Sequence, residues 1–298
     1  MSNANTATVA APAPVNAKKT NQTLELLKRL AKNKAAMISL IVIVILILAA
    51  IFAPVLSPYD YKEMVAENIN ATPSLAHPFG CDRLGRDLFS RVLIGGRWSL
   101  SLGFMGTAVS LVFAVIIGAI AGFFGQVADN IVMRVLDIIQ AIPGILLSMV
   151  ISTVLGPGFM QTVFALAVGG IPGNARMLRA TILSIRNSEY VEAASTINCS
   201  YARIIIKHIL PNAFAPLLVG AAMGIGGTIM QASMLSFVGL GVQPPTPEWG
   251  ALLTDGRNYI STFPHLIAFP GIMIGIVSLA LCLIGDGLRD AMDPKLKK

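Results

Sequence analysis

The sequence predicts an all-α polytopic membrane protein with six transmembrane helices and with both termini in the cytoplasm. Its 298 residues include only 22 basic and 15 acidic ones, so charged types make up 12% of the chain, about half the share in an average soluble domain. Apolar types make up 55%, and the mean hydropathy is +0.73. A soluble enzyme with so few charges would cover its surface poorly, which argues against that class.

The spacing of the charges predicts the individual helices. A helix needs about 20 apolar residues to cross a hydrocarbon core of about 30 Å. Charge-free stretches of at least that length run over residues 35–59, 98–128, 138–175, 208–247 and 258–285. The third is too long for one span, and a Gly-Pro-Gly turn signal at 156–158 divides it. We therefore expect transmembrane helices at 36–56, 98–123, 131–155, 160–180, 212–235 and 265–287.

Core helices of a large soluble protein are the alternative for these segments. Such helices show a polar face with a period of 3.6 residues. Residues 37–48 contain no such face, which favours the membrane.

The distribution of Lys and Arg predicts the orientation, because basic residues near the ends of spans are retained in the cytoplasm. Six lie before the first span, five lie between the end of the fourth span and the fifth, and four lie near the C-terminus. With six spans, these three segments share one side. The first loop, residues 57–97, also holds five basic residues and conflicts with the rule. The net charge of +7 is thus a signal of topology, and no nucleic acid partner is expected.

The remaining segments follow from this topology. Residues 57–97 would form an extracytoplasmic loop that ends in an interfacial amphipathic helix, with Arg86, Asp87, Ser90 and Arg91 toward water. Residues 98–287 would form a five-helix core. Residues 1–35 are predicted to be a disordered basic cytoplasmic tail, and residues 288–298 a cytoplasmic C-terminal tail.

Residues 185–211, here called the elbow, are predicted to form two short cytoplasmic helices joined by a turn. Asn187 or Ser188 can cap the first helix, and Asn198 can end it in the left-handed conformation. Ser200 can cap the second helix, and Pro211 suits the first turn of the fifth span. Such a shape can dock in a groove of another protein and carry motion into the two attached spans. The alternative is a solvated loop that is merely helical.

The elbow resembles the cytoplasmic signature of the inner-membrane permease subunits of binding-protein-dependent ABC importers. The matching residues are Glu192, Ala193, Ala194, Asn198, Leu210 and Pro211, with Asn198 in place of the family's glycine and His208 in place of an aliphatic residue. Three further blocks, residues 77–87, 236–250 and 285–294, are similar to the dipeptide, oligopeptide and nickel permease group. The tail length and the last block resemble its C-type subunit.

This resemblance implies a type I ABC importer permease fold with alternating access. The implied partners are a homologous B-type permease subunit, two cytoplasmic ATPase subunits and an extracytoplasmic substrate-binding protein, in a bacterial or archaeal inner or plasma membrane. ATP and Mg would bind to the ATPase subunits, since this chain contains no phosphate-loop motif. We expect no catalytic residue and no cofactor in this chain. The implied ATPase-coupling residues are Glu192, Ala193, Ala194, Asn198, Ser200, Leu210 and Pro211.

The implied cargo is a di- or oligopeptide, with nickel chelate, glutathione or another small solute as alternatives. Uncharged polar residues within the spans are candidates for the substrate pathway, because a polar side chain is unfavourable against lipid. They are Gln140, Gln161, Asn174, Gln231 and Ser233. The alternative is that these groups only join helices by hydrogen bonds. Asp137 and Arg134, one turn apart, are predicted to form an ion pair.

No metal site is predicted. The three cysteines show no motif spacing, and the three histidines fall on different sides of the membrane. Three other classes stay open at this point. A secondary transporter would need a buried carboxylate or an inverted repeat, an intramembrane enzyme would need a paired catalytic set, and a channel would conduct without a binding protein.

Overall fold

The structure, a computed structural model, describes residues 29–292 of the chain, and most of these are helical. The predicted 1–35 tail and the end of the 288–298 tail lie largely outside the described residues. The helices are α2 (Lys34–Ile51), α3 (Ala53–Leu56), η1 (Ala66–Asn68), α4 (Leu88–Phe123), α5 (Gln126–Gln140), α6 (Gly144–Leu155), α7 (Phe159–Ile185), α8 (Glu189–Thr196), α9 (Tyr201–Ile204), η2 (Ile205–Ile209), α10 (Leu210–Phe237), α11 (Trp249–Gly256), η3 (Arg257–Tyr259) and α12 (His265–Met292).

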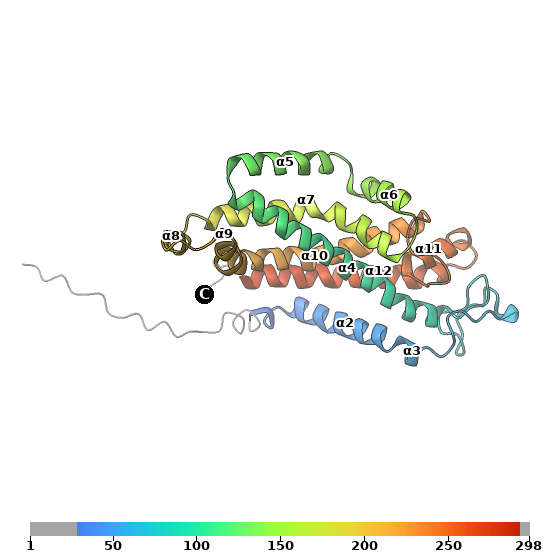
Figure 1. Cartoon of the computed structure of the whole chain (residues 1–298). Coiled ribbons are helices and arrows are strands. Elements are labelled where there is room, and N and C mark those ends of the chain that lie inside the picture. Colours follow the sequence, from blue (N-terminus) through green and yellow to red (C-terminus); the bar gives the residue numbers. More distant parts are fainter. Residues whose placement is uncertain (1–28, 293–298) are drawn as a thin grey trace, which may run out of the picture.

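The long helices lie side by side (Figure 1), with α4 packed against α7 and α10, and α12 packed between α10 and α2. Small residues allow these helices to approach closely, as is common in membranes. A Cβ atom on Gly118 of α4 would lie 2.7 Å from the Ala175 carbonyl oxygen of α7. A Cβ atom on Gly226 of α10 would lie 3.1 Å from the Ser278 carbonyl oxygen of α12. Larger side chains at these two positions would force the helices apart.

Four helices of the described residues are long and apolar enough to cross a membrane: α2, α4, the continuous run Tyr201–Phe237, and α12. The bent pair of α5 and α6 makes a fifth if it is one span. The predicted span 131–155 is therefore not straight, because the helix axis turns by 85° at residues 141–143. Pro143 is the cause, since it lacks an N–H and disfavours a helical residue before it.

The first loop differs from its prediction. The predicted interfacial helix and the second span are one helix, α4, which runs unbroken for 36 residues. The prediction that Arg86, Asp87, Ser90 and Arg91 face water is wrong, because all four are buried. Arg86 and Arg91 form ion pairs, and Asp87 and Ser90 form hydrogen bonds, within the protein. Their amphipathic pattern therefore reflects a buried network and not a water-facing surface.

Candidate functional site: the elbow and a polar cavity

The elbow is held by a small apolar core. Val191 and Ala194 of α8 are buried against Ile182 of α7 and against Ile204 and Ile209 of the following helices. These side chains come from both sides of the turn. The core therefore fastens the elbow to one end of α7 and of α10, the end that we predict to be cytoplasmic.

Asn198 makes the turn as predicted. Its φ angle is +59°, and the backbone around it forms the two bonds of a Schellman motif. The Cys199 N–H donates to the Ala194 carbonyl oxygen at 3.1 Å, and the Asn198 N–H donates to the Ser195 carbonyl oxygen at 3.0 Å. Asparagine is thus able to hold the position at which the resembled signature has glycine.

The two serines predicted to cap the helices of the elbow lie at the expected positions but do not form the expected hydrogen bonds. Ser188 and Ser200 stand at the N-cap positions of α8 and α9, but neither side chain accepts a hydrogen bond there. The Ser188 hydroxyl donates instead to the Ile185 carbonyl oxygen at 2.6 Å. The hydroxyl that we expected to cap α8 therefore forms a hydrogen bond with the last turn of α7.

The second arm of the elbow is continuous with the fifth predicted span. η2 is a π-helix that joins α9 directly to α10, so that residues 201–237 form one helical run. Pro211, in the first turn of α10, lacks the N–H that would bond to residue 207, and widened turns of this kind absorb such a loss. The π-helix was not predicted from the sequence, although Pro211 is a signal for it. Because η2 joins the two helices directly, no loop separates α9 from α10.

The outer face of the elbow exposes both polar and large apolar side chains. Glu192 and Ala193 are exposed, and Ile197, Tyr201 and Ile206 are 75%, 65% and 63% exposed. This surface stands at one end of the helices (Figure 1). Exposed apolar groups rimmed by polar ones are typical of a protein-binding surface.

A polar cavity of about 400 Å³ lies among α4, α5, α7 and α10. Three of the five predicted pathway residues line it, namely Gln140, Asn174 and Gln231, together with Thr107, Ser110, Thr228 and several glycines. Within the described part of the chain, its lining contains no charged side chain. The cavity can therefore accept hydrogen-bonding groups of either polarity.

The same polar groups also join helices, so both interpretations of them fit the geometry. The Asn174 amide donates to the Ser110 hydroxyl at 3.2 Å. The Gln231 amide donates to the Gly144 carbonyl oxygen at 3.1 Å and to the Ser148 hydroxyl at 2.9 Å. The role of the three residues in transport stays a prediction.

Gln161 and Ser233 lie outside this cavity. Gln161 is in the first turn of α7, beside Gly158. Ser233 donates to the Ile229 carbonyl oxygen at 3.0 Å and lines a separate, mostly apolar groove of about 420 Å³. Spacing along a helix does not distinguish these two residues from the other three.

Asp137 pairs with Arg176 of α7 at 2.5 Å, and not with Arg134 as predicted. Arg176 also donates to the Gln140 side chain, and Arg179 forms a two-point ion pair with Asp129. The helical spacing suggested a local partner, but the arginines of a neighbouring helix lie closer. These contacts fasten α5 to α7 beside the cavity.

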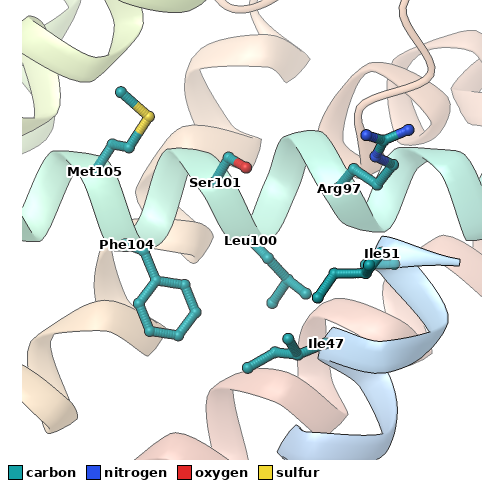
Figure 2. Close-up of a pocket in the computed structure, with 8 residues that line it drawn as sticks. Ile47, Ile51, Arg97, Leu100, Ser101, Phe104 and Met105 are labelled. Carbon is teal, nitrogen blue, oxygen red and sulfur yellow. The ribbon is translucent and has the colours of Figure 1, made fainter.

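A further groove, of about 480 Å³, separates α2 from α4 and contains none of the predicted residues. Figure 2 shows Ile47 and Ile51 of α2 next to Leu100 of α4, with Arg97 farther along the same helix. Its lining is mainly apolar, as expected of a surface between helices that faces lipid.

The family described as "Binding-protein-dependent transport system inner membrane component" matches residues 114–298, and the one described as "N-terminal TM domain of oligopeptide transport permease C" matches residues 21–73. The chain belongs to this permease family. It is 43% identical to the dipeptide transport system permease protein DppC of Alkalihalophilus pseudofirmus, over 92% of this chain and 90% of that protein. It is 41% identical to the glutathione transport system permease protein GsiD of Escherichia coli, over the same shares.

The fold of this permease is also that of a solved transporter. An inward-facing structure of the MetNI methionine ABC transporter has a TM-score of 0.54 and 20% identity, and covers 69% of this chain and 98% of that chain. The chain is therefore an ABC importer permease subunit, a multi-pass membrane protein and not an enzyme. The secondary transporter, the intramembrane enzyme and the channel are set aside by this membership.

The permease carries a second ordered region at the end opposite the elbow (Figure 1). We call it the loop cap and define it as residues 57–87 together with α11. Asp82 contacts Arg86 at 2.7 Å and Arg91 at 3.4 Å, and Asp255 of α11 contacts Arg86 at 3.3 Å and Arg91 at 3.6 Å. These ion pairs join the loop to α4 and to α11.

Two further buried groups complete the loop cap. Glu248 is fully buried and accepts hydrogen bonds from the Ser99 hydroxyl at 3.0 Å and from the Gly250 N–H at 2.9 Å. Burial, together with the negative charges of Asp87 and Asp82, raises the pKa of the Cys81 thiol to about 11. In the absence of a bound ion, the thiol is therefore protonated at neutral pH.

Proposed function

We propose that this chain is the C-type permease subunit of an ATP-driven importer of di- or oligopeptides. The observation that carries the proposal is the similarity of nearly the whole chain to a dipeptide permease. The uncharged polar cavity supports it, because peptide bonds present donors and acceptors while the side chains of peptides vary. Glutathione is the second candidate, since the similarity to a glutathione permease is almost as high. Nickel chelates and other small solutes follow.

We propose six spans of the type I arrangement: α2, α4, the bent pair α5 and α6, α7, α10 and α12. The span added to the five described above is α7. It has 27 residues, so its length of about 40 Å is sufficient to cross a bilayer. The positions of Lys and Arg support cytoplasmic termini and a cytoplasmic elbow. The loop cap is then extracytoplasmic, where a substrate-binding protein would deliver its cargo.

In the proposed cycle the elbow sits in a groove of an ATPase subunit. ATP and Mg bind to the two ATPase subunits, and the permease needs no cofactor of its own for transport. When the ATPase subunits close, the groove moves α8 and α9, and the continuous run from α9 to α10 rocks one wall of the cavity. A homologous B-type permease supplies the other half of the pathway. Exposed Glu192, Ala193 and Ile197 make the contact with the groove.

The test is reconstitution of the full complex, with its binding protein, in vesicles that contain ATP. We expect uptake of labelled dipeptide, no uptake without ATP, and competition by unlabelled peptides. Uptake of glutathione that dipeptides do not inhibit would replace the peptide assignment with the second candidate.

The pathway assignment is tested by Gln231→Leu and Asn174→Leu, with Gln161→Leu as the control outside the cavity. Loss of a hydrogen-bonding group inside the cavity should reduce uptake several-fold at unchanged protein level, because each removed bond contributes about 1 kcal/mol. Equal uptake by all three variants would leave Gln231 and Asn174 as helix-joining residues only.

A further inference from the structure

The loop cap brings together three potential metal ligands that are separated along the chain. A ligand atom of His77, the Cys81 sulfur and a carboxylate oxygen of Asp87 all lie within 4.8 Å of one another. Cys81 is fully buried and the Asp87 side chain is 1% exposed, while the His77 side chain is 14% exposed. The group is therefore shielded by protein and reachable from one side, through His77.

The backbone holds these residues in place. Residues 81 and 87 form an isolated antiparallel bridge, with the Asp82 N–H donating to the Arg86 carbonyl oxygen at 2.9 Å. Gly85, with a φ angle of +73°, makes the turn between them. The Cys81 N–H also donates to the Ala71 carbonyl oxygen at 2.9 Å. Sites on such fixed backbone hold their ligands more precisely than sites on open loops.

Two of the three ligands are also oriented by further hydrogen bonds. The Asp87 carboxylate accepts from the Ser90 N–H at 2.7 Å, which leaves its other oxygen, Oδ1, directed at His77 Nδ1 at 2.9 Å. His77 Nε2 lies 3.2 Å from the Asn68 amide. A histidine fixed through its second nitrogen and a carboxylate fixed through its second oxygen are the usual supports of a metal site.

The nitrogen of a second histidine lies close to the turn that carries Cys81. His265, at the start of α12, is 9% exposed, and its Nε2 has no hydrogen-bond partner among residues 29–292. This atom is 2.9 Å from the place that a Cβ of Gly80 would occupy, next to Cys81 in the chain. The turn that carries Cys81 therefore lies next to an imidazole nitrogen whose hydrogen-bonding capacity is not used.

From this arrangement we propose that His77, Cys81 and Asp87 bind one divalent metal ion of the zinc class. Thiolate, imidazole and carboxylate together suit Zn²⁺, whereas Ca²⁺ and Mg²⁺ take oxygen ligands. Bonds of about 2.0–2.3 Å place the ligand atoms of a tetrahedral Zn²⁺ about 3.3–3.8 Å apart. The widest separation in the group, 4.8 Å, would therefore shorten by at least about 1 Å, and the 2.9 Å between His77 Nδ1 and Asp87 Oδ1 would lengthen by about 0.5 Å. The ion would displace the Cys81 proton to solvent and would bind the Nδ1 lone pair of His77 in the tautomer that carries its proton on Nε2, with the Asn68 amide turned so that its oxygen accepts from that N–H. With one thiolate and one carboxylate as the anionic ligands, the site is neutral.

The site is independent of the transport function proposed above. The ion would join His77 to the hairpin of residues 80–88, whose Asp87 is the N-cap of α4, and so stabilise the loop cap. The three residues are not recognisable as a site in the sequence, because their spacing matches no metal-binding motif.

The test uses the complete complex, purified with a tag that lacks histidine, stripped of metal and titrated with Co²⁺. We expect one Co²⁺ per chain with a thiolate-to-cobalt charge-transfer band, displacement of that band by Zn²⁺, and a higher melting temperature with Zn²⁺. Cys81→Ser should lose the band and the stabilisation by Zn²⁺, whereas Cys199→Ser and Cys282→Ser should keep both.

Asp87→Asn guards against a folding defect, because asparagine can still cap α4. It should keep the fold and lower the affinity for Co²⁺ by at least about tenfold. The proposal is overturned if the wild-type complex shows no thiolate band, or if Cys81→Ser binds Co²⁺ with the same spectrum and affinity as the wild type.

Discussion

The elbow and the loop cap lie at opposite ends of the same helices and are held by opposite means (Figure 1). The elbow buries small apolar side chains and leaves Ile197 and Tyr201 exposed to solvent. The loop cap buries charges, with Asp82 and Arg86 nearly inaccessible. Buried ion pairs tolerate little displacement, because a separated buried charge is costly. Apolar contacts are less directional. The apolar end of the bundle can therefore shift at a lower cost than the end that buries its charges.

The largest expected effect is at the elbow. Ala193→Trp or Glu192→Arg should abolish uptake and uncouple ATPase activity from substrate, because both positions are exposed and would contact the ATPase groove. Stability should change by less than about 0.5 kcal/mol, as is usual for surface positions. Transport and melting temperature of the reconstituted complex measure the two effects.

Ser195→Arg supplies the control for added bulk and charge, since Ser195 is exposed but outside the matched signature. It should retain more transport than Ala193→Trp. Full substrate-stimulated ATPase activity and uptake in Ala193→Trp would contradict the coupling role, and with it the distinction between the two ends.

The second effect is at the loop cap. Asp82→Asn removes the charge that faces both Arg86 and Arg91, and leaves two buried cations with Asp255 alone. Breaking a buried pair typically costs about 3–5 kcal/mol, so we expect a clearly lower melting temperature and a lower yield of inserted protein. Glu63→Gln, an exposed acid of the same loop, should have little effect. Equal melting temperatures of the two variants would show that the ion network does not stabilise the loop cap.

These two regions also show how far the sequence can be interpreted. The turn at Asn198 was predictable, because a left-handed residue after a short helix has a local signal. The burial of Arg86 and Arg91 was not predictable from the sequence. Their partner Asp255 lies 169 residues beyond Arg86, and the alternation of polar and apolar residues around them is the same as in a helix at the surface. The long charge-free stretches predicted α2, α4, α10 and α12, while the bend at Pro143 had a signal that hydropathy alone ignores. Among the pathway candidates, only the packing of the helices shows that Asn174 lines the cavity and that Gln161 does not.

The smallest effect compares the two asparagines with positive φ, Asn198 in the elbow at +59° and Asn70 in the loop cap at +56°. Glycine takes this conformation without the steric cost of a side chain, so each Asn→Gly change should stabilise its own region by up to about 1 kcal/mol. Hydrogen exchange of the neighbouring amides measures this stabilisation, with an expected rise in protection of up to about fivefold.

The two sites should differ in the size and extent of the gain. Because the Asn70 side-chain oxygen is buried without a hydrogen-bond partner among the described residues, its removal should give the larger gain. In the elbow the gain should be local to α8, since that helix can open without disturbing the bundle. In the loop cap it should extend to the first turn of α4, because Asn70 donates its N–H to the Asp82 carbonyl oxygen at 3.0 Å. A gain confined to residues next to Asn70 would mean that the loop cap, like the elbow, opens in separate pieces.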